Sequence, residues 1–135
     1  MALATWDDNL SVNVAELDLQ HKQLIRMIND LHEAMRNKKG KAALDKIINT
    51  MIDYAARHFS LEEKYFRQFG YPEAAAHKTE HDQFIERVGQ FKSDFEAGKL
   101  TLTIEVMNFL RDWLLHHIKC TDGQYGTFLN EQGLV

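Results

Sequence analysis

Residues 44–69 read LDKIINTMIDYAARHFSLEEKYFRQF. Every third or fourth position of this stretch carries a residue suited to a protein interior, which predicts one long helix with a single buried face. That face consists of Leu44, Ile48, Met51, Ala55, His58, Glu62, Tyr65 and Phe69. A histidine and a glutamate, four residues apart and therefore on the same side of the helix, interrupt a stripe that is otherwise apolar or aromatic.

The same spacing recurs in three other segments of the chain. Their stripes are Leu17, His21, Leu24, Ile28, Leu31 and Met35; Ala74, His77, His81, Phe84, Val88, Phe91 and Phe95; and Met107, Leu110, Leu114 and His117. We expect helices at about residues 17–37, 41–69, 73–97 and 101–119, after an N-terminal arm of residues 1–16. Because the connections are short, the sequence predicts an all-α, up-down-up-down four-helix bundle that forms one domain over residues 1–135.

Composition narrows the class of protein. The net charge of −4 argues against the clustered basic surface of a nucleic-acid-binding domain, and no apolar run approaches the roughly 18 residues of a membrane span. The N-terminal sequence MALATWDDN lacks the basic start and apolar stretch of a signal peptide. Cys120 is the single cysteine, so it cannot form an internal disulfide. We therefore expect a cytoplasmic protein that binds no nucleic acid and does not span a membrane.

Polar side chains occupy core positions in all four stripes, where burial without partners costs several kcal/mol for each group. These residues are His21, His58, Glu62, His77, His81 and His117. They lie at similar distances from the predicted loops, so at about 1.5 Å per residue the antiparallel helices bring them to one level of the bundle. Asp122 follows His117 by five residues, and we expect a turn at Thr121-Asp122-Gly123 to swing its carboxylate inward. The sequence therefore predicts a single metal site.

The number of candidate ligands, five imidazoles and two carboxylates, exceeds the needs of one metal ion. Two six-coordinate ions would take all five imidazoles, two bridging carboxylates and one bridging oxide or hydroxide, and one coordination position would remain open. Imidazole combined with carboxylate suits iron, whereas zinc prefers four-coordinate sites. The ligand set therefore favours a pair of iron ions with room for one small diatomic molecule.

Together these motifs resemble the hemerythrin family, and in particular the single-domain bacterial hemerythrins. The resemblance covers nearly the whole chain and is carried by Trp6, Asp18-Leu19-Gln20-His21, His58-Phe59-Ser60-Leu61-Glu62-Glu63, Gly70-Tyr71-Pro72, His77, His81, Trp113-Leu114-Leu115-His116-His117-Ile118 and Asp122. Seven ligands in the family's order and spacing make this a specific pattern.

The resemblance implies two iron ions per chain, joined by an oxo or hydroxo bridge and by carboxylates. The implied ligands are His21 and His58 for the iron with the open position, His77, His81 and His117 for the saturated iron, and Glu62 and Asp122 for both. The residues at the family's oxygen-pocket positions are Leu24, Phe59, Trp113 and Leu114, with Tyr125 nearby. We expect Glu63 to be solvated, and His117 to be the ligand rather than its neighbour His116.

The function implied by the resemblance is reversible oxygen binding for storage, transport or delivery, by a protein that is not an enzyme. Molecular oxygen is the expected partner, a protein acceptor of that oxygen is compatible with this role, and the sequence leaves the oligomeric state open. The alternatives are a di-iron sensor of oxygen or nitric oxide, and a peroxidase or nitric-oxide-reducing enzyme. Ferritin-like oxidases use Glu-x-x-His motifs, whereas this chain has His-x-x-x-Glu and His-x-x-x-His.

Overall fold

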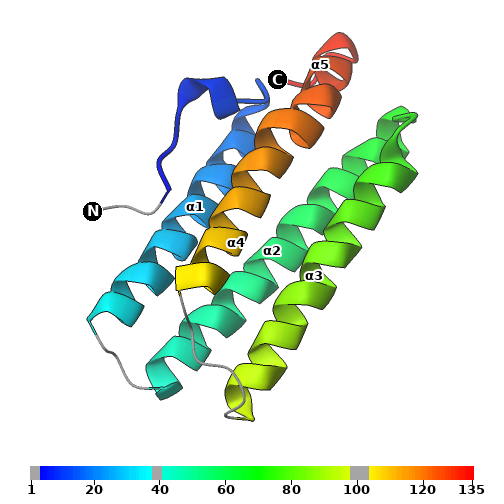
Figure 1. Ribbon diagram of the computed structural model, residues 1–135. Helices are drawn as coiled ribbons and strands as arrows, with labels where there is room; N and C mark the ends of the chain where they lie inside the picture. The colour runs from blue at the N-terminus through cyan, green and yellow to red at the C-terminus, as the bar shows by residue number, and fades with distance from the viewer. Residues whose placement is uncertain (1–3, 38–40, 98–103) are drawn as a thin grey trace.

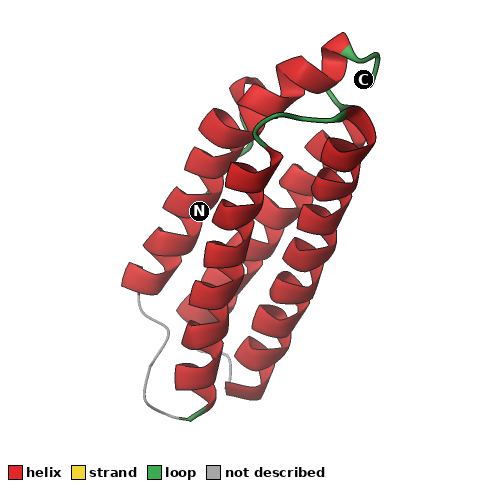
Figure 2. Ribbon diagram, turned by 90° about the vertical axis from the view of Figure 1, so that its right-hand side faces the viewer, coloured by secondary structure: helices red, strands yellow, loops and turns green. Residues whose placement is uncertain are grey.

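The computed structural model describes residues 4–37, 41–97 and 104–135, and its long helices form one bundle (Figure 1). The helices are α1 (Ala15–Arg36), α2 (Lys41–Phe69), α3 (Ala74–Glu96), α4 (Ile104–His116) and α5 (Gly123–Glu131). Helix α1 packs against α2 and α4, and α2 packs against α3. Successive long helices run in opposite directions, so the predicted all-α, up-down-up-down bundle is confirmed. Figure 2 shows no strand in the described part of the chain.

The end of α4 differs from the sequence prediction. We expected the fourth helix to end near residue 119 and the chain to turn at residues 121–123. Instead the backbone continues as a π-helical segment, η2 (His117–Asp122), and then as α5, so the turn was wrong. A π-helix pairs residue i with residue i+5, which lengthens one turn without ending the helix. Single inserted turns of this kind leave little trace in the hydrophobic spacing from which the helix was predicted.

The buried stripe of α2 also departs from its predicted course near the end of the helix. Phe66, rather than Tyr65, is buried at this point. The Tyr65 hydroxyl instead donates a hydrogen bond to Glu16 at the surface, over 2.7 Å. A strict seven-residue repeat drifts by about 20° per heptad relative to a straight α-helix. Over a helix of 29 residues, that drift moves the inward direction to the neighbouring residue.

Two apolar clusters fill the interior, one on each side of the level where the polar core residues lie. The larger cluster contains residues such as Leu24, Phe59 and Leu114. The smaller one gathers side chains from the N-terminal arm, from the beginning of α1, from the end of α2 and from α5, including Leu17 and Tyr125. The two clusters therefore enclose a polar layer from both ends.

No helix in the described residues is both long and apolar enough to cross a bilayer.

The N-terminal arm is fastened to the bundle by side chains of α1. Asp18 accepts hydrogen bonds from the Ser11 hydroxyl and from the backbone N–H of Val12. The Asn29 amide exchanges two hydrogen bonds with the backbone of Ala4, at 2.8 and 2.9 Å. The arm also passes so close to α5 that a Cβ at Gly126 would lie 2.7 Å from the carbonyl oxygen of Val12. The arm thus closes the end of the bundle beside the polar layer.

We predict that Gly126→Ala destabilises the protein, whereas Gly89→Ala stabilises it. A methyl group at 126 must displace the backbone of Val12, and overpacking of this kind costs about 1–3 kcal/mol. Gly89 is exposed inside α3 with no atom near its added Cβ, so alanine there should gain roughly 0.5–1 kcal/mol. Urea unfolding followed by circular dichroism measures both changes. Equal stability of the two variants would contradict the close contact.

Candidate metal centre

Seven buried polar side chains converge in the middle of the bundle, from α1, α2, α3 and η2. Each is at most 2% exposed: His21, His58, Glu62, His77, His81, His117 and Asp122. Their ligand atoms form two groups, and within each group the atoms lie within 4.8 Å of one another. One group is His21, His58, Glu62 and Asp122, and the other is Glu62, His77, His81, His117 and Asp122. The two carboxylates belong to both groups.

Each carboxylate divides its two oxygens between the two groups. Glu62 directs Oε2 to Nε2 of His58 at 3.3 Å and Oε1 to Nε2 of His81 at 3.1 Å. Asp122 directs Oδ2 to Nε2 of His21 at 3.1 Å and Oδ1 to Nε2 of His77 at 2.8 Å. This is the arrangement needed by a carboxylate that bridges two metal ions.

The π-helical segment explains how Asp122 reaches this cluster. In an α-helix, residues five apart are separated by about 140° around the axis, at about 100° per residue. The wider π turn brings residue i+5 into line with residue i, so the His117 and Asp122 side chains face the same way. Asp122 Oδ1 lies 3.1 Å from Nε2 of His117. The inserted turn therefore performs the task that we had assigned to a loop.

Three of the histidines are oriented by hydrogen bonds to their outer ring nitrogens. Nδ1 of His58 lies 2.6 Å from the amide oxygen of Gln20. Nδ1 of His81 lies 3.1 Å from Glu63, and Nδ1 of His117 lies 3.1 Å from Glu80. Because an oxygen acceptor holds the proton on Nδ1, the Nε2 lone pair of each ring is left facing the cluster.

The residues that hold these rings were missed by the sequence analysis. Glu63 was expected to be solvated, but its carboxylate accepts from His81, so that expectation was wrong. Gln20, Glu63 and Glu80 each stand next to a candidate ligand in the sequence and reach a histidine on a different helix. A polar residue beside a core ligand was the available signal. Helix periodicity alone assigns such a position to the surface.

The cluster contains polar atoms that the protein itself does not satisfy. Among the described side chains, both ring nitrogens of His21 and of His77, Oε1 of Glu62 and both carboxylate oxygens of Asp122 are buried without a hydrogen-bond partner. Nε2 of His81 lies 3.2 Å from Nε2 of His117, and with both Nδ1 protons held by carboxylates these two lone pairs face each other. Two imidazole lone pairs directed at one point are the donors that a metal ion takes from neighbouring histidines, so the residues fit a metal centre.

The electrostatics of the cluster point in the same direction. Burial acts to lower the pKa of His21, but Asp122 and Glu62 outweigh it and raise the pKa to about 10. The pKa of His77 rises to about 9, again against burial, through Asp122 and Glu62. Burial and the Glu62 charge act to raise the pKa of Asp122, yet His117 and His21 hold it below its ordinary value. The two buried carboxylates therefore require nearby positive charge.

A small apolar cavity lies next to the candidate metal ligands. Its lining residues are Leu24, Ile28, Met51, Ala55, Phe59, Phe84 and Leu114. It holds about 10 Å³ of space for the centre of a water-sized molecule, which is close to the minimum for one water, and apolar cavities stay dry. Leu24 and Leu114 lie within one turn of His21 and His117, and the Phe59 ring stacks on His81 at 3.9 Å.

Two aromatic residues near the site act differently from the cavity-lining residues. Trp113 is not among the lining residues of this cavity, because its ring stacks on His117 at 4.5 Å and on Phe84 at 4.2 Å. The buried Tyr125 hydroxyl donates a hydrogen bond to Oε2 of Glu62. Burial raises the pKa of Tyr125 well above its ordinary value, with a further contribution from the Glu62 charge, so the phenol keeps its proton.

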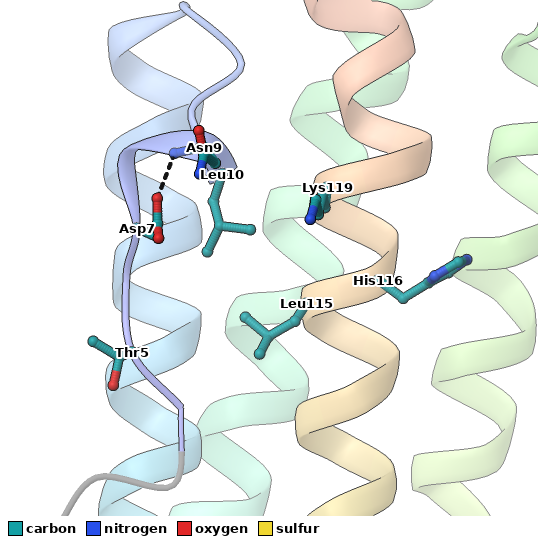
Figure 3. Close-up of a pocket in the computed structure, with 7 residues that line it drawn as sticks. All are labelled: Thr5, Asp7, Asn9, Leu10, Leu115, His116 and Lys119. Atoms are coloured by element: carbon teal, nitrogen blue, oxygen red, sulfur yellow. Dashed lines mark hydrogen bonds between the residues drawn. The ribbon is translucent and has the colours of Figure 1, made fainter.

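His116 lies outside the cluster. It is exposed and lines an open surface pocket with Leu115 and Lys119, against Thr5, Asp7, Asn9 and Leu10 of the arm (Figure 3). Figure 3 shows its ring directed away from the arm. His117, one residue later, is buried with its ring nitrogen toward Asp122.

Comparison with known proteins gives a consistent answer. Residues 12–129 match the family model described as the hemerythrin HHE cation binding domain. The bacteriohemerythrin of Stenotrophomonas maltophilia is 38% identical over 93% of this chain and 80% of its own length. That of Methylococcus capsulatus is 35% identical over 96% of this chain and 99% of its own length. A solved wild-type hemerythrin superimposes with a TM-score of 0.88, at 35% identity, over 93% of this chain and 97% of that one.

We predict that His77→Ala abolishes stable metal loading. The substitution removes one ligand and leaves two buried carboxylates with less positive charge around them, which is strongly destabilising. Metal per chain is measured after anaerobic reconstitution and desalting, and the melting temperature is measured by circular dichroism. His116→Ala, which alters an exposed histidine of the same bundle, should match the wild type in both. Full metal loading of the His77 variant would remove it from the ligand set.

Proposed function

This chain belongs to the hemerythrin family, and on that basis we propose that it binds molecular oxygen reversibly at a pair of iron ions held in the middle of the bundle. Members of this family bind non-haem iron, and they are generally oxygen-binding proteins rather than enzymes. The observation that carries the proposal is the division of the Glu62 and Asp122 oxygens between two groups of histidines. A carboxylate that directs its two oxygens to two separate groups of histidines can coordinate two adjacent metal ions, one through each oxygen.

We assign the ligands by the two groups of buried side chains. His21 and His58 would hold one iron, and His77, His81 and His117 would hold the other. Glu62 and Asp122 would bridge them. Two histidines against three leave the first ion with fewer protein ligands, which supports placing the open coordination position there. When bound, the iron pair supplies that open position and the electrons that reversible oxygen binding requires.

The protein's own contribution is to hold the ligands, exclude water and retain protons. Leu24, Phe59 and Leu114 surround an apolar space beside the ligands that is large enough for one small molecule. A neutral diatomic enters such a space at little cost, whereas water loses hydrogen bonds that the apolar lining does not replace. Tyr125 keeps its proton, and its hydroxyl donates a hydrogen bond to Oε2 of Glu62, which fixes the orientation of that carboxylate.

The sensor and enzyme alternatives are less favoured than oxygen binding. Relatives that are 35–38% identical over more than nine tenths of this chain are named bacteriohemerythrins. The site is also deeply buried, with every ligand at most 2% exposed. The apolar cavity beside it has room for about one small molecule, which suits a diatomic gas better than a larger substrate.

Reversible binding is tested by cycling the iron-loaded protein between anaerobic buffer and air while visible absorbance is recorded. We expect a band that appears with oxygen and disappears when oxygen is removed, over repeated cycles, with two iron ions per chain. Irreversible conversion to a ferric spectrum, with net consumption of oxygen, would overturn the proposal in favour of an enzyme or a sensor.

We predict that Leu114→Ala accelerates oxidation of the oxygen-loaded protein. The shorter side chain removes part of the apolar cover between solvent and the candidate ligands, so oxidants reach them more easily. Leu110→Ala is the matched control because Leu110 is equally buried in α4 but does not line this cavity. Both substitutions should cost about 2–5 kcal/mol of stability, but only the first should change the oxidation rate, followed as the decay of the oxygen-dependent band. Equal oxidation rates in the two variants would remove Leu114 from the oxygen pocket.

A further inference from the structure

The hydrogen bonds that orient the histidines are distributed unequally between the two groups of ligands. In the three-histidine group, His81 and His117 direct Nδ1 to the carboxylates of Glu63 and Glu80, both at 3.1 Å. In the two-histidine group, His58 directs Nδ1 to the neutral amide of Gln20. Among the described residues, no hydrogen-bond partner is present at Nδ1 of His21, or at Nδ1 of His77 in the three-histidine group. At the outer ring nitrogens, the three-histidine group therefore has two carboxylate partners and the two-histidine group has none.

A carboxylate acceptor changes the imidazole that donates to it. Hydrogen bonds to ionised groups are roughly twice as strong as those between neutral groups, and they draw the Nδ1 proton outward, so the opposite nitrogen becomes a more basic metal ligand. A more basic ligand set stabilises the higher charge of an oxidised metal ion. An amide acceptor fixes the ring orientation but transfers much less negative charge to the ring.

We propose that Glu63 and Glu80 are positioning residues that make the iron held by His77, His81 and His117 the harder of the two to reduce. Gln20 leaves the other iron easier to reduce. The two metal positions thus differ in reduction potential because of residues that do not touch the metal. This inference rests on the proposed iron pair but does not depend on whether the pair binds oxygen.

The exposure of the two carboxylates ranks their effects. The Glu63 side chain is 19% exposed, whereas that of Glu80 is 39% exposed. Water screens an exposed charge more strongly than a buried one, so Glu63 should influence its histidine more than Glu80 does.

The test is an anaerobic redox titration of the iron-loaded protein, with mediators, followed by visible absorbance. Glu63→Gln and Glu80→Gln keep the shape of the side chain and remove its charge, so both should raise the midpoint potential, Glu63→Gln by more. Gln20→Glu adds a charge to the other position and should lower the midpoint potential. All three should bring the two one-electron steps closer together. Glu86→Gln, an exposed carboxylate on α3, is the control for loss of one charge.

A second measurement follows release of iron to a chelator. Mutation of the partner of a ligating histidine typically costs 10–100-fold in metal affinity. Because Glu63→Gln keeps an acceptor but loses its charge, it should release iron faster than Glu86→Gln, at roughly the lower end of that range. If Glu63→Gln does not hold iron long enough for titration, Glu80→Gln and Gln20→Glu still give opposite expected shifts.

The outcomes separate this inference from the proposed function. Shifts no larger than that of Glu86→Gln, or shifts of the same sign in Glu80→Gln and Gln20→Glu, would overturn the tuning by carboxylates. If the variants show the expected redox shifts but the wild-type protein shows no reversible oxygen band, oxygen binding is overturned and the tuning stays intact.

Discussion

Two buried carboxylates, Glu62 and Asp122, impose the constraint on which the rest of this structure depends. Both are fully buried, and a buried carboxylate without compensating positive charge is expensive. The bundle surrounds them with five imidazoles, whose Nε2 atoms approach the carboxylate oxygens at 2.8–3.7 Å. The carboxylates raise the pKa values of His21 and His77, so positive charge on the imidazoles, or on cations held between them, balances this layer. The apolar clusters on either side of this layer contribute the hydrophobic burial that stabilises the folded bundle.

The π-helical segment is the local device that satisfies this constraint. Without the extra residue in the turn, His117 and Asp122 would face different directions, and one of them would leave the cluster. The segment also continues the chain into α5, which carries Tyr125 to Glu62 and brings Gly126 against the N-terminal arm. One irregular turn therefore places Asp122 in the polar layer, places a hydrogen-bond donor beside Glu62, and brings α5 against the N-terminal arm.

Much of this arrangement could be predicted from the sequence, because burial and helix periodicity are coupled. A histidine such as His21 or His77 continues the helical spacing of an apolar stripe. Its position therefore predicts both a helix and a polar group inside the bundle. The mode of entry of Asp122 could not be predicted, since a π turn depends on backbone pairing that side-chain spacing does not record. The course of α2 past Glu62 was mistaken by one residue, with Phe66 buried in place of Tyr65, because small errors in helical pitch accumulate over a long helix.

The hydrogen-bonding shell was the least predictable part, and the reason is geometric. Gln20, Glu63 and Glu80 lie at the edge of their own helix faces, where composition suggests solvent. Their partners are on neighbouring helices, so the contacts exist only after the helices have packed. Once packed, they lock the histidine rings and set the charge around each group. The bundle thus places chemically similar candidate ligands in two unlike environments, because only the three-histidine group directs outer ring nitrogens to carboxylates.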